Sequence, residues 1–463
     1  MLNCRWIDLL AGCWLAGCLL AGSLCVGAVG QVAARAANLS KDEPAPAART
    51  LVSLADFLAA PEHASLPLGA IVPALTADWA TAPLSRAATF AAAELLMQHQ
   101  RHVWGDLLRP QWEARAMTAA GKTMKFVVKR FGAAADGAKW EGYGAAAALA
   151  RWPLYISMHG GGQTSAKMND GQWQNQIGLY QPENGLYIAP RAPTDTWNMW
   201  HEAHMDSLFV ALIDAAVLLD NVDPDRVYLM GYSAGGDGVY QLAPRMADHF
   251  AAAAMMAGHP NDASPLGLRN LPLMLQVGAN DNAFDRANVA KGFGEQIAKL
   301  HEADLKGYVS VTKLHEDKGH WMDRQDGIAL PWMAQHKRNL WPDRVVWKQS
   351  GVTRGEMYWL ALPANVAPIA GTLVTGSVAG QTITLTRPEP VREISSITVL
   401  LNDRLLNLDK PVKIVLDGEQ APLFEGRVKR TIVDVATLIA RRSDYGAAGD
   451  VPAAMVTVEL SKK

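Results

Sequence analysis

The stretch DPDRVYLMGYSAGG, residues 223–236, decides the fold of this chain of 463 residues. Residues 227–230 form an apolar run typical of a buried strand, the pentapeptide 231–235 follows without a spacer, and residues 239–243 continue as a helix. Strand, sharp turn and helix are the setting that a nucleophile elbow requires, and they would leave Ser233 standing above the sheet. A G-x-S-x-G pentapeptide alone also fits an ordinary tight turn, so its surroundings must decide.

Buried strand patterns alternate with helical patterns on both sides of this turn. Continuous apolar runs predict strands at residues 153–158, 186–189, 251–256, 273–277 and 308–313, and an alternating run predicts an early, edge strand at 123–131. One-sided apolar spacing predicts helices at residues 202–220 and 287–303. This alternation indicates an α/β protein with a mostly parallel sheet flanked by helices.

The chain on either side of this α/β region has a different character. Helical spacing over residues 51–115 predicts an N-terminal extension that packs on the main domain. Short alternating runs after residue 345 predict a small antiparallel β-sandwich with one helix at 433–441. Aromatic residues are scarce after Trp359, which favours a structural role for the sandwich over binding of a carbohydrate or polymer.

These patterns divide the chain into five segments. They are an exported leader at residues 1–36, a linker at 37–50, the helical extension at 51–120, the α/β catalytic domain at 121–342 and the β-rich domain at 343–463.

The leader contains every cysteine of the chain: Cys4, Cys13, Cys18 and Cys25. Its apolar run after Arg5 is typical of a secretory signal. The segment LAGC that ends at Cys18 also resembles a bacterial lipoprotein box, so ordinary signal cleavage and a lipid anchor at Cys18 both stay open. Either outcome predicts a periplasmic or secreted protein whose folded part has no disulfide, thiol nucleophile or cysteine-ligated metal.

Composition and spacing argue against several classes of function. The chain is 49% hydrophobic and 19% charged with a net charge of −2, which is ordinary for a soluble globular protein and lacks the basic excess of a nucleic-acid partner. The segment HEAH at 201–204 lacks the spacing of a zinc motif, and the glycines at 160–162 lack the ending of a phosphate-binding loop. We therefore expect no metal and no cofactor.

A nucleophilic serine needs a base, an acid that orients the base, and N–H donors for the oxyanion. In an α/β sheet such groups lie just beyond the carboxyl ends of the strands. Asp281 follows the strand at 273–277 and is the candidate acid, whereas Asp285 is the reserve because it fits a helix cap better. His320 follows the next strand in a polar loop and is the candidate base, with His315 as its reserve.

Two parts of the chain offer the oxyanion donors. The N–H of Ala234 is fixed by the elbow, and the segment HGGG at 159–162 follows an early strand. Glycines let a backbone approach a developing oxyanion closely, so Gly161 and Gly162 are the candidate second donors. His159 is expected to orient this loop rather than to act as a second base.

Together these motifs resemble those of serine hydrolases with the α/β-hydrolase fold, in which Ser233, Asp281 and His320 have the usual chain order. The segments DPDRVYLMGYSAGGDGVYQLA, MHGGGQ and GANDNAFDR are similar to secreted carboxylesterases of the polyhydroxybutyrate-depolymerase and feruloyl-esterase-like group. The resemblance covers about residues 123–341. It implies acyl transfer to Ser233 and hydrolysis of the acyl-enzyme by water that His320 activates.

The loops at the same edge predict an open site. Residues 259–270 are too few for a lid domain. The open site that results would suit a large or polymeric ester. The candidate pocket residues are Trp197, Trp200, Trp321 and His259. Tryptophans that seal the core fit the pattern equally well. A prolyl-oligopeptidase-like serine peptidase is the competing function, although the residues before 123 are too few for a propeller. An inert binding module on the same fold is a third alternative.

Overall fold

A computed structural model gives the structure of the protein and describes residues 45–132, 151–390 and 393–460. The expected leader, with its signal and Cys18, lies outside these residues. Helix α2 (Ala45–Ala59) begins inside the segment expected to be a linker. Residues 45–50, expected to belong to the linker, are therefore helical, and the helix buries Leu51 and Leu54 completely.

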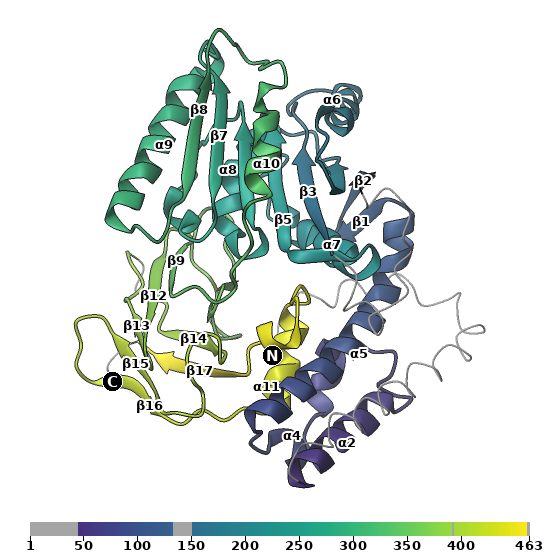
Figure 1. The fold of residues 1–463 in the computed structure, drawn as a ribbon, viewed down its shortest axis with the longest axis vertical. Helices are drawn as coiled ribbons and strands as arrows, with labels where there is room; N and C mark the ends of the chain where they lie inside the picture. Colours follow the sequence, from purple (N-terminus) through teal and green to yellow (C-terminus); the bar gives the residue numbers. More distant parts are fainter. Residues whose placement is uncertain (1–44, 133–150, 391–392, 461–463) are drawn as a thin grey trace.

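The α/β unit is built on an eight-stranded sheet with the order β1-β2-β4-β3-β5-β6-β7-β8 (Figure 1). The strands are β1 (Ala116–Ala119), β2 (Lys122–Phe131), β3 (Trp152–Met158), β4 (Gly185–Pro190), β5 (Val222–Tyr232), β6 (Ala252–Met256), β7 (Leu273–Gly278) and β8 (Ser310–His315). Strands β3 to β8 are parallel to one another. At one end of the sheet, β2 pairs antiparallel with β4, and β1 pairs antiparallel with β2. The expected edge strand is β2, but it pairs with both β1 and β4, so the edge is β1.

Helices cover both faces of this sheet. They are α6 (Ala166–Leu179), α7 (His204–Leu219), α8 (Ala234–Arg245), α9 (Arg286–Ala303) and α10 (Ala329–Met333). Successive strand residues point to opposite faces, so Leu154 and Ile156 pack with α7 and α8, whereas Tyr155 packs with α10 and residues after α6. The predicted α/β class is confirmed, and the strand order around β5 is that of the α/β-hydrolase fold.

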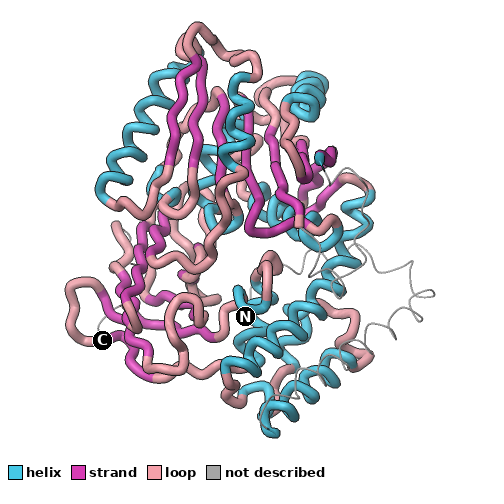
Figure 2. The backbone as a smooth tube through the Cα atoms, in the orientation of Figure 1, coloured by secondary structure: helices cyan, strands magenta, loops and turns pink. Residues whose placement is uncertain are grey.

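The β-rich region forms two further sheets. One has the order β10-β11-β14-β17 and the other β16-β15-β13-β12-β9. Figure 2 draws the strands of this region in magenta. Their strands are β9 (Arg344–Lys348), β10 (Glu356–Met357), β11 (Leu360–Ala361), β12 (Leu373–Ala379), β13 (Thr382–Leu385), β14 (Ser396–Leu401), β15 (Val412–Leu416), β16 (Pro422–Gly426) and β17 (Ala454–Glu459). Strands β13 and β15 pair in parallel. The prediction of a purely antiparallel sandwich is therefore wrong for this pair. The predicted helix is α11 (Ile432–Arg441).

The N-terminal extension packs largely against this β-rich region. Its remaining helices are α3 (Leu68–Ile71), α4 (Asp78–Thr81) and α5 (Arg86–Glu113). The buried side chains of α2 and of the first half of α5 form one core with Ile432 and Val435 of α11. The prediction that the extension packs on the main domain is correct for the end of α5, where Leu108 and Trp112 join the core of the α/β unit.

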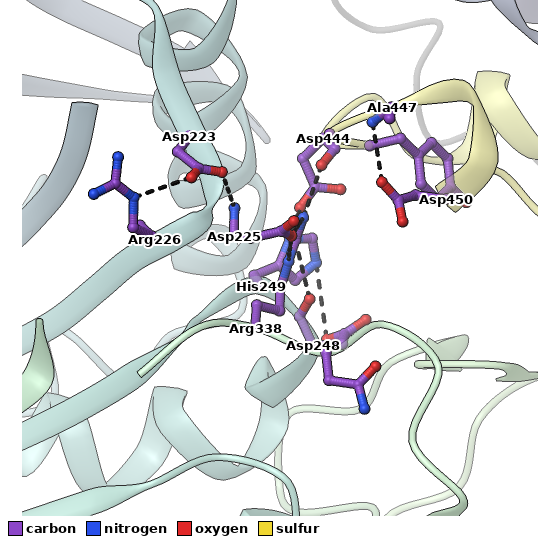
Figure 3. A network of polar contacts seen from close by, with 12 residues as sticks. Asp223, Asp225, Arg226, Asp248, His249, Arg338, Asp444, Ala447 and Asp450 are labelled. Atoms are coloured by element: carbon purple, nitrogen blue, oxygen red, sulfur yellow. Dashed lines mark hydrogen bonds and ion pairs between the residues drawn. The ribbon is translucent and has the colours of Figure 1, made fainter. Parts of the chain in front are cut away.

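Both added parts lie at the amino-terminal edge of the central sheet. Figure 1 shows β9–β17 and α2–α5 in its lower half, below the α/β unit. Arg338 joins the parts there: it donates to Asp225 at the start of β5, to the carbonyl of Asp248 just before β6, and to Asp444 after α11 (Figure 3). The carboxyl-terminal edge of the sheet therefore stays clear of both. In the described part of the chain, no helix has both the length and the apolar character needed to cross a membrane.

Candidate active site

The turn between β5 and α8 holds Ser233 in a strained backbone conformation. Its φ is 56° and its ψ is −122°, a region that non-glycine residues rarely adopt. Its N–H donates to the carbonyl of Met256 on the neighbouring strand at 2.9 Å, which ties the turn to the sheet. A Cβ atom on Gly231 would lie 2.2 Å from the Gly235 carbonyl oxygen, and one on Gly235 would lie 2.2 Å from that of Met158. Both positions therefore require glycine.

Three of the predicted residues lie in one hydrogen-bonded line at the carboxyl-terminal edge of the sheet. His320 Nε2 is 3.0 Å from Ser233 Oγ, and His320 Nδ1 is 2.7 Å from Asp281 Oδ2. The Asp281 side chain is 1% exposed, whereas that of His320 is 42% exposed. A buried carboxylate beside one ring nitrogen fixes the proton on Nδ1, so Nε2 faces the serine as a proton acceptor.

The two reserve residues are placed elsewhere. Asp285 lies exposed at the start of α9 and accepts a hydrogen bond from the Asn288 side chain at 2.7 Å. His315 is buried at the end of β8, where its Nε2 atom is 2.9 Å from Gln276 Oε1. Neither is in the line with Ser233.

The loop after β3 is held by His159. Its Nδ1 donates to the Gly160 carbonyl at 2.6 Å, its Nε2 accepts from the Ala192 N–H at 3.1 Å, and Trp200 Nε1 donates to its carbonyl. Burial lowers the pKa of His159 to about 4, so the ring is neutral. Because the carbonyl and N–H of one peptide point in opposite directions, holding the Gly160 carbonyl on His159 turns the Gly161 N–H away from that ring.

The expected donor Gly162 is engaged elsewhere. Its N–H donates to Asn169 Oδ1 at 2.9 Å, and this corrects its place in the expected oxyanion hole. Asn169 in turn donates to Asp195 at 2.7 Å, and Asp195 pairs with Arg191. Sequence reasoning missed Asn169, because a helical asparagine gives no signal of bonding a loop that precedes it in the chain.

The candidate pocket residues divide into exposed and buried ones. Trp197 is 54% exposed after β4 and Trp321 is 49% exposed beside His320. Trp200 is fully buried and stacks on Phe209, so it belongs to the core and not to the pocket. His259 is half-buried, and its ring is 3.2 Å from the Asn261 side chain oxygen.

Phe284, which the sequence did not single out, is the most exposed aromatic of this edge. Its side chain is 76% exposed after β7, and the guanidinium of Arg286 lies 4.8 Å from its ring centroid. Exposed aromatic side chains thus follow β4, β7 and β8, whose carboxyl ends lie at the same edge of the sheet. The chain between β6 and β7, which the structure describes fully, carries the short 3-10 helix η7 (Pro265–Leu268) and no lid.

Potential metal ligands are not gathered into a site in the described ranges. Within residues 45–132, 151–390 and 393–460, no three His, Cys, Asp or Glu side chains are grouped so that they could hold an ion.

Comparison with known proteins gives similar proteins for part of the chain. No protein-family model matches the chain. A segment of 161 residues, 33% of this chain, is 28% identical to a bifunctional acetylxylan esterase/xylanase of Neocallimastix patriciarum, of which it spans 23%. Among solved structures, a thermostable esterase has a TM-score of 0.35 at 15% identity, with 48% of this chain and 62% of that one covered.

A second solved structure is Est1E from Butyrivibrio proteoclasticus. It has a TM-score of 0.31 at 13% identity, and the match covers 48% of this chain and 95% of the Est1E chain. Likenesses of this size carry no conclusion about activity, and the fold is read from the strand order of this chain. By that topology the chain has the α/β-hydrolase fold, and the solved structures it is similar to include esterases.

Proposed function

We propose that this protein is a serine hydrolase of carboxylic esters, with Ser233 as nucleophile, His320 as general base and Asp281 as the acid that orients it. The observation that carries the proposal is the line from Ser233 Oγ to His320 Nε2 and on from His320 Nδ1 to Asp281, with distances of 3.0 and 2.7 Å. The strained turn supports it, because backbone strain of this kind persists where surroundings enforce it and gathers at functional sites.

The reaction would proceed in two acyl transfers. Ser233 Oγ attacks the ester carbonyl carbon while its proton passes to His320 Nε2, and the imidazolium is stabilised by Asp281. The tetrahedral intermediate collapses, the ester C–O bond breaks, and His320 gives the proton to the departing alkoxide. Water then attacks the acyl-enzyme, again losing its proton to His320, and the carboxylic acid leaves with Ser233 restored.

Two backbone N–H groups would stabilise the oxyanion of both intermediates. Ala234 is the first residue of α8, so its N–H lies at the positive end of the helix directly after Ser233. The Gly161 N–H is turned away from His159, and Gly160 lies so close to the serine that a Cβ there would be 3.0 Å from Ser233 Cβ. We therefore infer that Ala234 and Gly161 form the oxyanion hole.

The substrate side of the proposal rests on the openness of the site. His320 is 42% exposed, and the rim carries the exposed rings of Trp197, Phe284 and Trp321. A site with no lid domain between β6 and β7, and with exposed aromatic rings on the loops of its edge, suits large or polymeric esters. The partial similarity to an acetylxylan esterase/xylanase also favours esters over peptides. Export from the cytoplasm, with or without a lipid on Cys18, remains part of the proposal.

Hydrolysis of p-nitrophenyl acetate and of a p-nitroanilide peptide, by the wild type and by Ser233→Ala, tests the proposal. We expect ester turnover that falls by on the order of 10⁶ in the variant, with far slower anilide cleavage. His102→Ala is the control, because it removes an exposed histidine of α5, away from this edge of the sheet. Anilide turnover as fast as that of the ester would assign a serine peptidase, and ester turnover that survives in Ser233→Ala would reject the nucleophile.

A further inference from the structure

The loop that carries His320 has little regular structure of its own. It follows β8 and has positive φ values at Asp317, Asp323 and Arg324, of 59°, 53° and 62°. A histidine on such a loop reaches a serine on another strand only if other parts of the molecule hold the loop. Among the contacts that hold this loop, two come from the neighbouring loops that carry Asp281 and Ser233.

The first attachment comes from the Asp281 side. The N–H of Asn280 donates to the Lys318 carbonyl at 2.8 Å. Gly278 lies so close that a Cβ there would be 2.0 Å from the Gly319 carbonyl oxygen. This contact sets the loop relative to the carboxylate, but it leaves the distance to Ser233 unfixed.

The second attachment comes from Tyr232, the residue immediately before the serine. Its hydroxyl donates to the His320 carbonyl at 2.5 Å and accepts from the Met322 N–H at 3.2 Å. It is therefore hydrogen-bonded to the loop backbone on both sides of Trp321. Its ring lies edge-on to the ring of His320, with centroids 5.9 Å apart. Burial raises the pKa of Tyr232 well above its ordinary value, so the hydroxyl keeps its proton and stays a donor.

We propose that Tyr232 is the positioning residue that sets the distance between Ser233 Oγ and His320 Nε2. This inference rests on the proposed function, because it assigns a role to Tyr232 in the same reaction. The tyrosine and the serine are adjacent on one rigid turn. A hydroxyl that binds the backbone of His320 therefore fixes the position of the His320 imidazole relative to Ser233 Oγ. Its effect is expected on the chemical step and not on substrate binding.

Tyr232→Phe removes the hydroxyl and keeps the ring. We expect kcat for p-nitrophenyl acetate to fall by roughly 10- to 100-fold with KM nearly unchanged, since a misplacement of about 1 Å has this effect on a reacting pair. The matched control is Tyr228→Phe on the same strand, whose buried hydroxyl donates to the His336 carbonyl at 3.0 Å, away from the site. Its kcat should stay within about a factor of two of the wild type.

Hydrogen–deuterium exchange of the peptide that covers residues 316–324 gives a readout independent of turnover. We expect faster exchange in Tyr232→Phe and no change in Tyr228→Phe. Equal losses of kcat in both variants, or an unchanged kcat in Tyr232→Phe, would overturn the positioning role. Wild-type protein without Ser233-dependent turnover would reject the proposed function instead, and unchanged exchange in Tyr232→Phe would still reject the attachment itself.

Discussion

The Nε2 atom of His320 lies 3.0 Å from the Oγ atom of Ser233, although 87 positions separate the two residues. The sheet brings them together. Strand β5 ends in the elbow and β8 leads into the histidine loop, and the carboxyl ends of parallel strands meet at one edge of a sheet. The acid Asp281 follows β7, which pairs with β8 along its whole length.

The acid can be tested by an isosteric exchange. Asp281→Asn is expected to lower kcat by roughly 10³- to 10⁴-fold, because an amide cannot hold the proton on His320 Nδ1 or stabilise the imidazolium. Asp285→Asn, four positions on and exposed, is the control and should leave kcat within about a factor of two. Equal effects of the two exchanges on ester hydrolysis would show that Asp281 is not the orienting acid.

The oxyanion loop can be tested through its glycines. Gly161 has a φ of +107°, and a Cβ there would lie 2.2 Å from Asn169 Oδ1, so Gly161→Ala must displace the loop and its N–H. We expect kcat to fall by roughly 10²-fold or more, the effect of losing one oxyanion donor.

Gly171→Ala provides the control for that exchange. Gly171 lies in α6, where an added Cβ would have nothing within 4 Å, and alanine there should raise stability by up to about 1 kcal/mol without changing kcat. A normal kcat in Gly161→Ala would contradict the assignment of this loop to the oxyanion.

Asp214 on α7 makes stability depend on pH. Burial raises its pKa to about 8, whereas an unfolded aspartate ionises near pH 4. The folded state therefore keeps a proton that the unfolded state loses, and the contribution of Asp214 to stability falls as pH rises from about 4 to 8. Asp214→Asn resembles the protonated acid and can still accept the hydrogen bond of Trp104 Nε1.

This variant should be more stable than the wild type at pH 8, by up to about 5 kcal/mol for a pKa raised from about 4 to about 8, and equally stable at pH 4. Urea unfolding followed by circular dichroism at both pH values measures the difference. A difference of the same size at pH 4 and pH 8 would show that Asp214 does not titrate between them.

Arg338 tests whether the β-rich region is an independent module. Its side chain is 1% exposed and bonds residues of β5, of the segment before β6 and of the segment after α11 (Figure 3). Removing one partner of a buried ion pair leaves the others uncompensated, so Arg338→Met should lower the free energy of unfolding by about 3–5 kcal/mol.

The control is Lys306→Ala, which breaks the exposed pair with Asp343 near the same boundary and should change stability by less than about 1 kcal/mol. One cooperative unfolding transition is expected in the wild type, because a single buried core runs from β3 to β17. Two separate transitions, with Arg338→Met moving one of them alone, would show that the parts fold independently.

The residues of the proposed site were found from sequence because each follows a strand whose apolar run is visible. Ser233, Asp281 and His320 needed no knowledge of their distances, since the parallel sheet dictates that they share an edge. The close backbone contacts and the positive φ of that edge also left a signal: an added Cβ would clash with backbone at Gly231 and Gly235, and Gly161 has a positive φ.

What the sequence did not reveal depends on contacts between distant segments. Trp200 and Trp197 look alike in the chain, yet the first is buried against Phe209 and the second is exposed. The engagement of Gly162 by Asn169 and the parallel pairing of β13 with β15 likewise arise from packing. Hydrophobic periodicity states which face is buried, but not which partner buries it.

Covalent labelling of the serine is the most direct test of the central claim. The wild type, Ser233→Ala and His320→Ala would be treated with a fluorophosphonate, and the modified peptide identified by mass spectrometry. We predict one adduct on Ser233 in the wild type, none in Ser233→Ala, and labelling slowed by at least about 10²-fold in His320→Ala. A wild type that stays unlabelled, or an adduct on another residue, would contradict the assignment of Ser233 as the nucleophile.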